Sequence, residues 1–316
     1  MPAEIFLEYL TQGMWGAFTE KASWPAQSLS LTLCVIDGKV PLRGDGAVAY
    51  TAGRAVATLP GALCVPVGVV DGVDAVDAAS CPPDKLDTLL GGEVKWVLCR
   101  ALLGKVDAGE AAAIARAVSL LAWHKENAFS GVDGAPTEYA LSGRRRKQPP
   151  SAGGRTMYPR VDPVAICLVE SADGTRCLLG RQQRYPPGMY TLVSGFVEHG
   201  ESVEAAAVRE VAEETGVRCH AASLVASQPW PLGRGHHCEL MLGCTARAIE
   251  GGEDIDVGGG GGGAGELEEA RWFERSEVLK MLGRVAPGIG AWTPPSYAIA
   301  HQLIRRWGEG TLPARL

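Results

Sequence analysis

The sequence predicts an α/β protein with two domains, and three observations support this expectation. The chain has 316 residues, which is long enough for two separate hydrophobic cores. Its second half combines short runs typical of strands, at residues 164–170, 176–180 and 190–193, with a helical segment at 203–215. Its first half repeats this mixture, because strand-like segments and turns fill residues 28–70 and an alanine-rich helical stretch occupies 111–123.

Composition and charge narrow the class of protein. Hydrophobic residues make up 46% of the chain and charged residues 21%, which is ordinary for a soluble globular protein. The net charge of −6 argues against extended contact with a phosphate backbone but permits one nucleotide in a local pocket. The nine cysteines are scattered without a CxxC pair, which indicates reduced thiols in a cytosol-like compartment. The longest apolar stretches contain proline and glycine and are too short to span a bilayer, so we expect a soluble protein with no membrane partner.

The most informative segment is residues 195–217, where a glycine-containing turn precedes a helix. Gly195 and Gly200 lie in this turn, where the backbone must bend tightly or approach a ligand closely. Ser202 is suited to cap the N-terminus of the helix, and Gly216 provides the left-handed residue that commonly ends one. The segment therefore predicts a loop followed by a capped helix.

Three carboxylates gather on one face of this helix. Glu210, Glu213 and Glu214 stand at positions i, i+3 and i+4, which lie within an arc of roughly 100°. Their mutual repulsion favours a hard divalent cation such as Mg²⁺, which prefers carboxylate oxygens, water and phosphate. Arg209 is placed to pair with Glu213 one turn away or to brace another carboxylate. A solvated acidic helix is the alternative, but it leaves the preceding glycines and Glu201 unexplained.

The spacing of these residues resembles the Nudix box. Gly195 is followed, at the fixed intervals of that motif, by Glu201, Arg209-Glu210-Val211, Glu213-Glu214 and Gly216-Val217. The resemblance implies an α/β/α sandwich with a mixed sheet, and metal-dependent hydrolysis of a nucleoside diphosphate linked to another group. It also implies catalytic roles for Glu201, Arg209, Glu210, Glu213 and Glu214.

Two further motifs resemble the NADH pyrophosphatase branch of the Nudix hydrolases, which includes enzymes that decap NAD-capped RNA. One motif is SQPWP at residues 227–231, and the other is YPRVDP at residues 158–163. The resemblance extends over about residues 110–316. It implies a homodimer and a smaller, degenerate Nudix-like α/β domain at the N-terminus. The expected regions are the N-terminal domain at 1–125, a linker at 126–157 and the catalytic domain at 158–316.

Residue by residue, the branch implies a set of metal ligands and a set of substrate contacts. Mg²⁺ or Mn²⁺ would be held by Glu210, Glu213, Glu214, Glu266 and the backbone carbonyl of Ser194. Substrate would contact Tyr158, Gln228, Trp230 and Ala300. Considered alone, residues 227–233 predict a loop that two prolines stiffen around Trp230. An indole presented in this way is suited to stack on a base, with a contribution of about 1–3 kcal/mol. A tryptophan that pins a loop to its own core is the alternative.

The linker departs from the pattern of the branch. Where the branch has four zinc-binding cysteines, this chain has Ser130, Asp133, Pro150 and Gly153. Because four thiolates define such a site, we expect no structural zinc. The basic run at 144–147 is interpreted as a solvated loop rather than as an RNA site.

Two later segments also depart from the branch. Residues 232–238 replace an aromatic-proline pair and a serine, which affects recognition of the nicotinamide end of a substrate. Within them, His236, His237 and Cys238 are more typical of a surface loop than of a soft-metal site, because consecutive side chains on an extended chain point to opposite faces. The glycines at 258–263 are interpreted as a flexible insertion.

Together these features predict hydrolysis of NADH or NAD⁺ to a nicotinamide mononucleotide and AMP, with Mg²⁺ or Mn²⁺ as cofactor. ADP-ribose, another dinucleotide or NAD-capped RNA are alternative substrates, and a nucleotide-binding sensor without catalysis is an alternative of another class. The tripeptide Ala314-Arg315-Leu316 resembles a peroxisomal address, which implies a peroxisomal or glycosome-like location and an import receptor as partner. Residence in the cytoplasm is the alternative.

Overall fold

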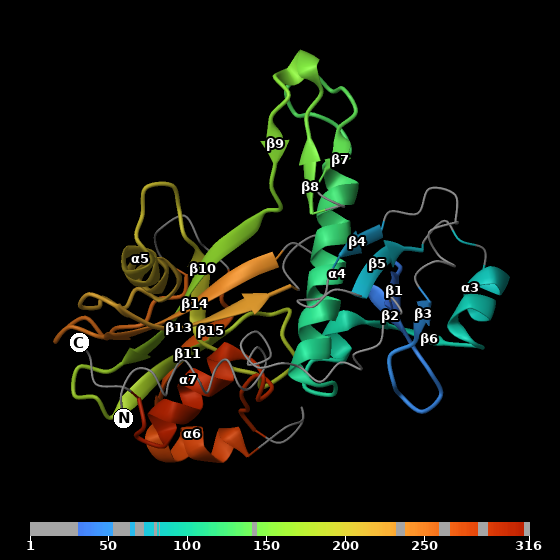
Figure 1. Cartoon of the computed structure of the whole chain (residues 1–316). Coiled ribbons are helices and arrows are strands. Elements are labelled where there is room, and N and C mark those ends of the chain that lie inside the picture. The colour runs from blue at the N-terminus through green and yellow to red at the C-terminus, as the bar shows by residue number, and fades with distance from the viewer. Residues whose placement is uncertain are drawn as a thin grey trace. The chain divides into compact units, whose positions relative to one another are not determined.

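The computed structural model describes residues 31–52, 64–66, 73–78, 81, 83–140, 144–231, 238–258, 266–283 and 290–312. These residues belong to two compact units, which are described separately (Figure 1). The first unit contains the described residues up to Val161, together with those of 230–239. The second contains the described residues of 162–229 and those from 240 onward.

The core of the second unit is a six-stranded sheet. Its strands follow the order β13-β14-β10-β11-β15, and β12 also pairs with β10. The pairs β10–β11, β10–β12 and β11–β15 are antiparallel. The strands are β10 (Val161–Glu170), β11 (Arg176–Arg181), β12 (Val193–Phe196), β13 (Ser223–Trp230), β14 (Cys238–Arg247) and β15 (Glu269–Glu274).

Helices cover both faces of this sheet. Figure 1 shows α5 (Val203–Thr215) on one side, and α6 (Arg275–Leu282) and α7 (Ile299–Gly308) on the other. Successive side chains of β10 alternate between the two layers, as a strand requires. Ile166 packs in the cluster that contains α6 and α7, whereas Cys167 packs in the cluster that contains α5. The expected α/β/α sandwich is therefore confirmed.

Close packing of α7 depends on a glycine in the sheet. A Cβ atom at Gly243 of β14 would lie 2.9 Å from Cδ1 of Ile299 and 3.1 Å from Cδ1 of Leu303. Real Cβ atoms do not approach other atoms so closely without displacing them. Gly243 therefore lets the buried face of α7 lie directly against the strand.

The first unit is also an α/β structure, as expected. Four strands form a sheet in the order β3-β1-β5-β4, and β2 pairs separately with β6. Helix α4 supplies Ile114, Val118 and Leu121 to a core that also contains Leu33 and Val40. The elements are β1 (Leu31–Val35), β2 (Lys39–Leu42), β3 (Tyr50–Ala52), β4 (Cys64–Pro66), β5 (Val73–Asp77), α3 (Pro83–Leu90), β6 (Lys95–Leu98) and α4 (Ala108–Glu126).

Residues 127–160, which we call the ribbon module, follow α4 and contain a small antiparallel sheet (Figure 1). Its strands are β7 (Glu138–Ala140), β8 (Arg145–Lys147) and β9 (Thr156–Met157), with β8 in the centre. The basic run expected as a solvated loop is thus mostly a strand. Its central residue, Arg146, is only 3% exposed.

Arg146 is buried because the module provides partners for its guanidinium group. Nε donates to Oγ1 of Thr137 at 2.5 Å, and Nη2 donates to the carbonyl of the same residue at 3.0 Å. Nη1 lies 3.3 Å from Nδ1 of His124, and the guanidinium lies 4.3 Å from the ring centroid of Tyr139. These contacts offset the cost of removing a charge from water, so the interpretation as a solvated loop was wrong for this residue.

Hydrogen bonds join the two turns of the module where the branch has cysteines. Oγ of Ser151 donates to Oδ2 of Asp133 at 2.8 Å, and the backbone N–H of Ala135 donates to Oδ1 of Asp133 at 3.2 Å. Oγ of Ser130 accepts from the backbone N–H of Val132 at 3.1 Å. The hydrogen bond from Ser151 comes first among the causes that lower the pKa of Asp133, because it stabilises the carboxylate form.

Two strand boundaries differ from those expected. Residues 227–230, expected in a loop, end strand β13. Pro229 is tolerated there because β13 is an edge strand, so its missing N–H breaks no ladder between two neighbours. The strand expected at 190–193 begins only at Val193. Among the described residues, no helix combines the length and apolarity needed to cross a membrane.

Candidate active site

The loop and helix of residues 195–217 have the local structure that their residue types predict. Oγ of Ser202 accepts a hydrogen bond from the backbone N–H of Ala205 at 3.2 Å and caps α5. Gly216 ends the helix with φ of 72°, and Gly200 turns the preceding loop with φ of 83°. L-residues with a side chain rarely adopt these angles, so both glycines are required by the backbone.

Gly195 has a different role, because it makes room for a carboxylate. A Cβ atom at this position would lie 1.9 Å from Cδ of Glu210 and 2.1 Å from its Oε2. The carboxyl group of Glu210 therefore lies directly against the backbone of β12. Ser194 precedes this glycine in the strand, opposite Ile166 of β10. Strand β12 and helix α5 thus meet at this backbone segment and this carboxylate.

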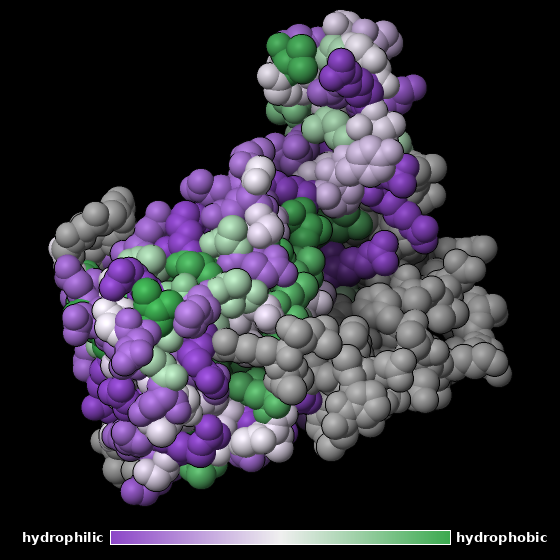
Figure 2. All heavy atoms as spheres, turned by 90° about the vertical axis from the view of Figure 1, so that its left-hand side faces the viewer, coloured by the Kyte–Doolittle hydropathy of each residue, from purple (hydrophilic) through white to green (hydrophobic). Residues whose placement is uncertain are grey.

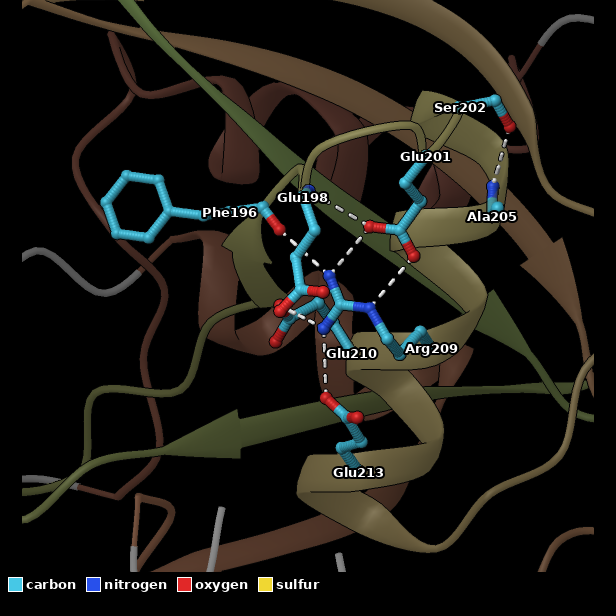
Figure 3. Close-up of polar contacts among 8 residues, drawn as sticks. All are labelled: Phe196, Glu198, Glu201, Ser202, Ala205, Arg209, Glu210 and Glu213. Atoms are coloured by element: carbon cyan, nitrogen blue, oxygen red, sulfur yellow. Dashed lines mark hydrogen bonds and ion pairs between the residues drawn. The ribbon is translucent and has the colours of Figure 1, made fainter. Parts of the chain in front are cut away.

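Arg209 connects three carboxylates and one carbonyl (Figure 3). Nε and Nη2 donate to the two oxygens of Glu201, both at 2.9 Å. Nη1 donates to Glu210 at 2.8 Å and to Glu213 at 2.9 Å, and Nη2 also donates to the carbonyl of Phe196 at 2.9 Å. A forked guanidinium suits such multiple recognition, so Arg209 holds the loop and the helix in one arrangement.

The loop is fixed from its other end by Glu201. Oε2 of this residue accepts a hydrogen bond from the backbone N–H of Glu198 at 3.1 Å (Figure 3). Its hydrogen bonds to Arg209 lower the pKa of its carboxyl group, because they stabilise the charged form. Glu201 is therefore held as a carboxylate that anchors the loop to Arg209 of α5.

In contrast to Glu201, Glu210 and Glu214 lie in an environment that raises the pKa of a carboxyl group. Burial raises the pKa of Glu210, although its hydrogen bond to Arg209 acts to lower it. Burial, and then the carboxylates of Glu210 and Glu266, raise the pKa of Glu214 to about 8. Each carboxylate disfavours ionisation of the next, so the cluster stores electrostatic repulsion that a cation would relieve.

Glu214 also has an oxygen without a hydrogen-bond partner. The residue is 6% exposed, and its Oε1 atom is buried and unpaired among the described residues. A buried unpaired carboxylate oxygen is costly in a native protein and usually has a reason, such as a missing ion. The oxygen-only donor set around it suits a hard cation such as Mg²⁺ or Mn²⁺.

The carboxylates are not arranged around a point in this structure. Within the described parts of the chain, no three Asp, Glu, His or Cys side chains stand where they could enclose a metal ion. Arg209 draws Glu210 and Glu213 to itself, and the side chain of Glu213 is 43% exposed. The residues fit a divalent cation by their chemistry and by the oxygen of Glu214 that has no partner among the described residues, while the side chains of Glu210 and Glu213 are paired with Arg209.

The four residues expected to contact substrate fall in different places. Gln228 and Ala300 are buried in the second unit, at 5% and 4% exposure. Tyr158 lies in the first unit and is 61% exposed, with the guanidinium of Arg145 4.4 Å from its ring centroid. Trp230 is the last residue of β13. Residues 232–237 of the following loop, and most of the glycine insertion, lie outside the described residues.

Gln228 makes contacts that its sequence motif does not reveal. Its Nε2 atom donates to the carbonyl of Tyr297 at 2.7 Å, and its Oε1 atom accepts from the backbone N–H of Ile299 at 2.8 Å. The second hydrogen bond satisfies a donor at the N-terminus of α7. Gln228 thereby joins the end of β13 to the first turn of α7, which contains Ala300.

The chain is similar to one family model and to three named proteins. The family model described as "NUDIX domain" matches residues 160–294. The chain is 44% identical to NAD-capped RNA hydrolase NUDT12 of Homo sapiens, over 63% of this chain and 42% of that protein. It is 38% identical to the mitochondrial NAD(P)H pyrophosphatase NUDT13 of Homo sapiens, over 75% of this chain and 66% of that protein. It is 35% identical to NAD-capped RNA hydrolase NudC of Mycobacterium bovis, over 74% of this chain and 78% of that protein. The chain thus matches less than half the length of the first relative.

Proposed function

This chain belongs to the Nudix hydrolase family, and we propose that it hydrolyses the diphosphate bond of NADH or NAD⁺ to nicotinamide mononucleotide (NMNH or NMN) and AMP. The observation that carries the proposal is the buried, unpaired oxygen of Glu214 beside Glu210 and Glu266. Relatives named as hydrolases or pyrophosphatases of NAD-containing molecules support this substrate class.

We assign the metal ligands as Glu210, Glu213, Glu214, Glu266 and the backbone carbonyl of Ser194. When bound there, Mg²⁺ or Mn²⁺ would neutralise phosphate charge and lower the pKa of a water molecule. One of the helix glutamates would accept the proton of the attacking water, since a carboxylate with a raised pKa is suited to that task near neutral pH. Arg209 and Glu201 would hold the loop and the carboxylates in place.

The residues that we assign to substrate recognition differ from those that we assign to catalysis. Trp230 and Tyr158 offer aromatic faces for the bases of a dinucleotide, and Ala300 lies in the first turn of α7. Gln228 would act by fixing that turn as well as by contact with substrate, because its amide joins Tyr297 and Ile299. A homodimer, the absence of structural zinc and peroxisomal import through Ala314-Arg315-Leu316 also remain proposals. The tripeptide lies outside the described residues.

Product identification tests the proposal. Purified protein is incubated with Mg²⁺ or Mn²⁺ and separately with NADH, NAD⁺, ADP-ribose and NAD-capped RNA, and the products are identified by mass spectrometry. NMNH or NMN together with AMP is the expected result. Ribose phosphate and AMP as the preferred products would instead assign ADP-ribose as substrate. Binding without products from any of the four would contradict hydrolysis and favour a nucleotide-binding sensor.

The Glu214→Gln variant tests whether the measured hydrolysis comes from this site or from a contaminating enzyme. We expect it to lower kcat for NADH by at least about a hundredfold, since loss of a ligand should cost no less than loss of the groups that orient one. The dissociation constant for NADH should change little. Glu250→Gln is the matched control, because Glu250 is an exposed glutamate of the same unit. Equal activity of Glu214→Gln and wild type would remove the assignment.

A further inference from the structure

The ribbon module carries a concentration of positive charge that the proposed chemistry does not use. Between residues 127 and 160 there are six cationic side chains and two carboxylates, in a chain whose net charge is −6. Asp133 is engaged with Ser151 and the backbone of Ala135. A local patch of opposite sign to the whole molecule is an electrostatic footprint for a polyanion.

The strand register divides these cations between two faces of the sheet. Arg146 stands opposite Tyr139 on β7 and Met157 on β9, and its side chain is buried. Side chains alternate along a strand, so the neighbours of Arg146 in β8, Arg145 and Lys147, belong to the other face. Arg145 lies over the ring of Tyr158 there, 4.4 Å from its centroid.

Further exposed cations belong to the module: Lys147 ends β8, Arg144 precedes β8, Arg155 precedes β9 and Arg160 follows it. The only strand carboxylate of the module, Glu138, stands opposite Lys147 in the register of β7 and β8. The side chains of the module that are turned to the viewer at the top of Figure 2 include strongly hydrophilic ones beside a few hydrophobic ones.

An exposed aromatic ring is placed among the cations. Tyr158 is 61% exposed and has the guanidinium of Arg145 4.4 Å from its ring centroid, whereas Tyr139 belongs to the face of Arg146. Exposed rings between cations are typical of surfaces on which nucleic acid bases stack while phosphates meet arginine and lysine. A membrane surface or an acidic peptide would use the charges but would have less use for the ring.

We propose that the face of the β7–β8–β9 sheet that carries Arg145 and Lys147, together with the exposed cations beside its strands, binds a single-stranded polynucleotide. The sheet has three strands, so it is about 10 Å wide, which suits one strand of a few nucleotides better than a duplex. The surface belongs entirely to the first unit and is independent of the carboxylate site. The inference therefore does not rest on the proposed hydrolysis, although it would also give NAD-capped RNA a second point of contact.

The test measures binding of a fluorescent twelve-nucleotide RNA and the matching DNA to the full chain by anisotropy at several salt concentrations. With up to five phosphate contacts, we expect the logarithm of the association constant to fall with the logarithm of salt concentration, with a slope near about −3.5. The triple variant Arg144→Glu, Lys147→Glu, Arg155→Glu should weaken binding by at least about tenfold. It should also flatten the slope by about 2.

Glu138→Lys is the matched opposite change. It removes the carboxylate across from Lys147 and should tighten binding severalfold, which no loss of folding would imitate. Turnover of NADH by both variants should equal that of wild type, because none of the changed residues is among those proposed to bind the metal or the substrate. If NADH turnover fails while RNA binds, only the proposed hydrolysis falls.

Two outcomes would overturn the inference. One is RNA binding that is unchanged in the triple variant and in Glu138→Lys while both variants retain the wild-type thermal midpoint. The other is equal or tighter binding of polyglutamate or of vesicles containing phosphatidylserine, which would assign the patch to an acidic protein or a membrane. Equal affinity for RNA and DNA would support a polynucleotide surface that does not read the 2′-hydroxyl.

Discussion

At the scale of single residues, Glu214 combines the features on which the proposed chemistry depends. It is buried, one of its oxygens has no partner among the described residues, and burial together with the neighbouring carboxylates raises its pKa to about 8. No one of these features alone would indicate a site, since buried glutamates also occur in structural networks. Together, on a helix with Glu210 and Glu213, they describe a carboxylate that is stable only when it is protonated or paired with a cation.

The raised pKa of Glu214 makes the stability of the metal-free protein depend on pH. The folded state holds a proton that the unfolded state releases near its ordinary pKa of about 4.3. Stability should therefore fall as pH rises from about 4.5 to about 8, and the loss is complete above that value. Glu214→Gln should remove this slope and should be the more stable protein at pH 9 in EDTA, by on the order of a few kcal/mol. Urea unfolding of both proteins at pH 5.5 and 9 measures this dependence of stability on pH. A wild-type protein that gains more stability than the variant over this range would contradict the prediction.

Gly195 gives a second prediction at this scale. Gly195→Ala places a methyl group where the carboxyl group of Glu210 now lies, so that side chain must move. We expect kcat to fall by at least about a hundredfold, because small displacements of catalytic groups have such effects. Gly283→Ala is the control in the same unit, since a Cβ there meets nothing closer than 3.9 Å. Comparable activity of both variants would show that Glu210 does not need its present position.

At the scale of elements, the site depends on a helix and a strand held together by side chains. Arg209 fixes the loop before α5 to that helix, and Gln228 fixes the end of β13 to the start of α7. Both residues bond to backbone groups that no motif displays. We therefore expect substitution of Gln228 to affect the start of α7.

Gln228→Leu removes both amide hydrogen bonds and leaves the N–H of Ile299 and the carbonyl of Tyr297 without that partner. We expect a loss of about 1–3 kcal/mol in the free energy of unfolding. If the first turn of α7 contacts substrate, KM for NADH should rise severalfold while kcat falls less. Gln228→Glu keeps an acceptor for Ile299 and should be less harmful to stability. A large fall in kcat at unchanged KM would instead assign Gln228 to the chemistry.

Elements with local signals were predictable from the sequence, whereas those that depend on distant partners were not. Ser202 and Gly216 announce the ends of α5, because caps act over three or four residues. The prolines at 229 and 231 predict a loop, whereas residues 227–230 end a strand, because its place at the sheet edge makes Pro229 acceptable. The basic run predicts a solvated Arg146, whereas the residue is buried, because its partner His124 lies 22 residues earlier in the chain.

At the scale of the whole molecule, the described residues form two compact units, and the carboxylate site lies within one of them. The residues of the box were identifiable because their spacing follows the helix period. The close approach of Glu210 to Gly195 was not, since it joins a strand to a helix through a side-chain contact. The net charge of −6 likewise does not reveal the cationic ribbon module, because a net charge does not say where along the chain the charged residues lie.

The central claim is that the carboxylates of α5 hold a divalent cation, and Mn²⁺ binding tests it most directly. Titration of the metal-free protein at pH 8.5, followed by electron paramagnetic resonance, should reveal saturable binding. Affinity should weaken as pH falls from 8.5 to 6, because Glu214 must lose its proton first. Binding should be lost in Glu214→Gln and kept in Glu250→Gln. Equal affinity in wild type and Glu214→Gln, with no dependence on pH, would contradict the account.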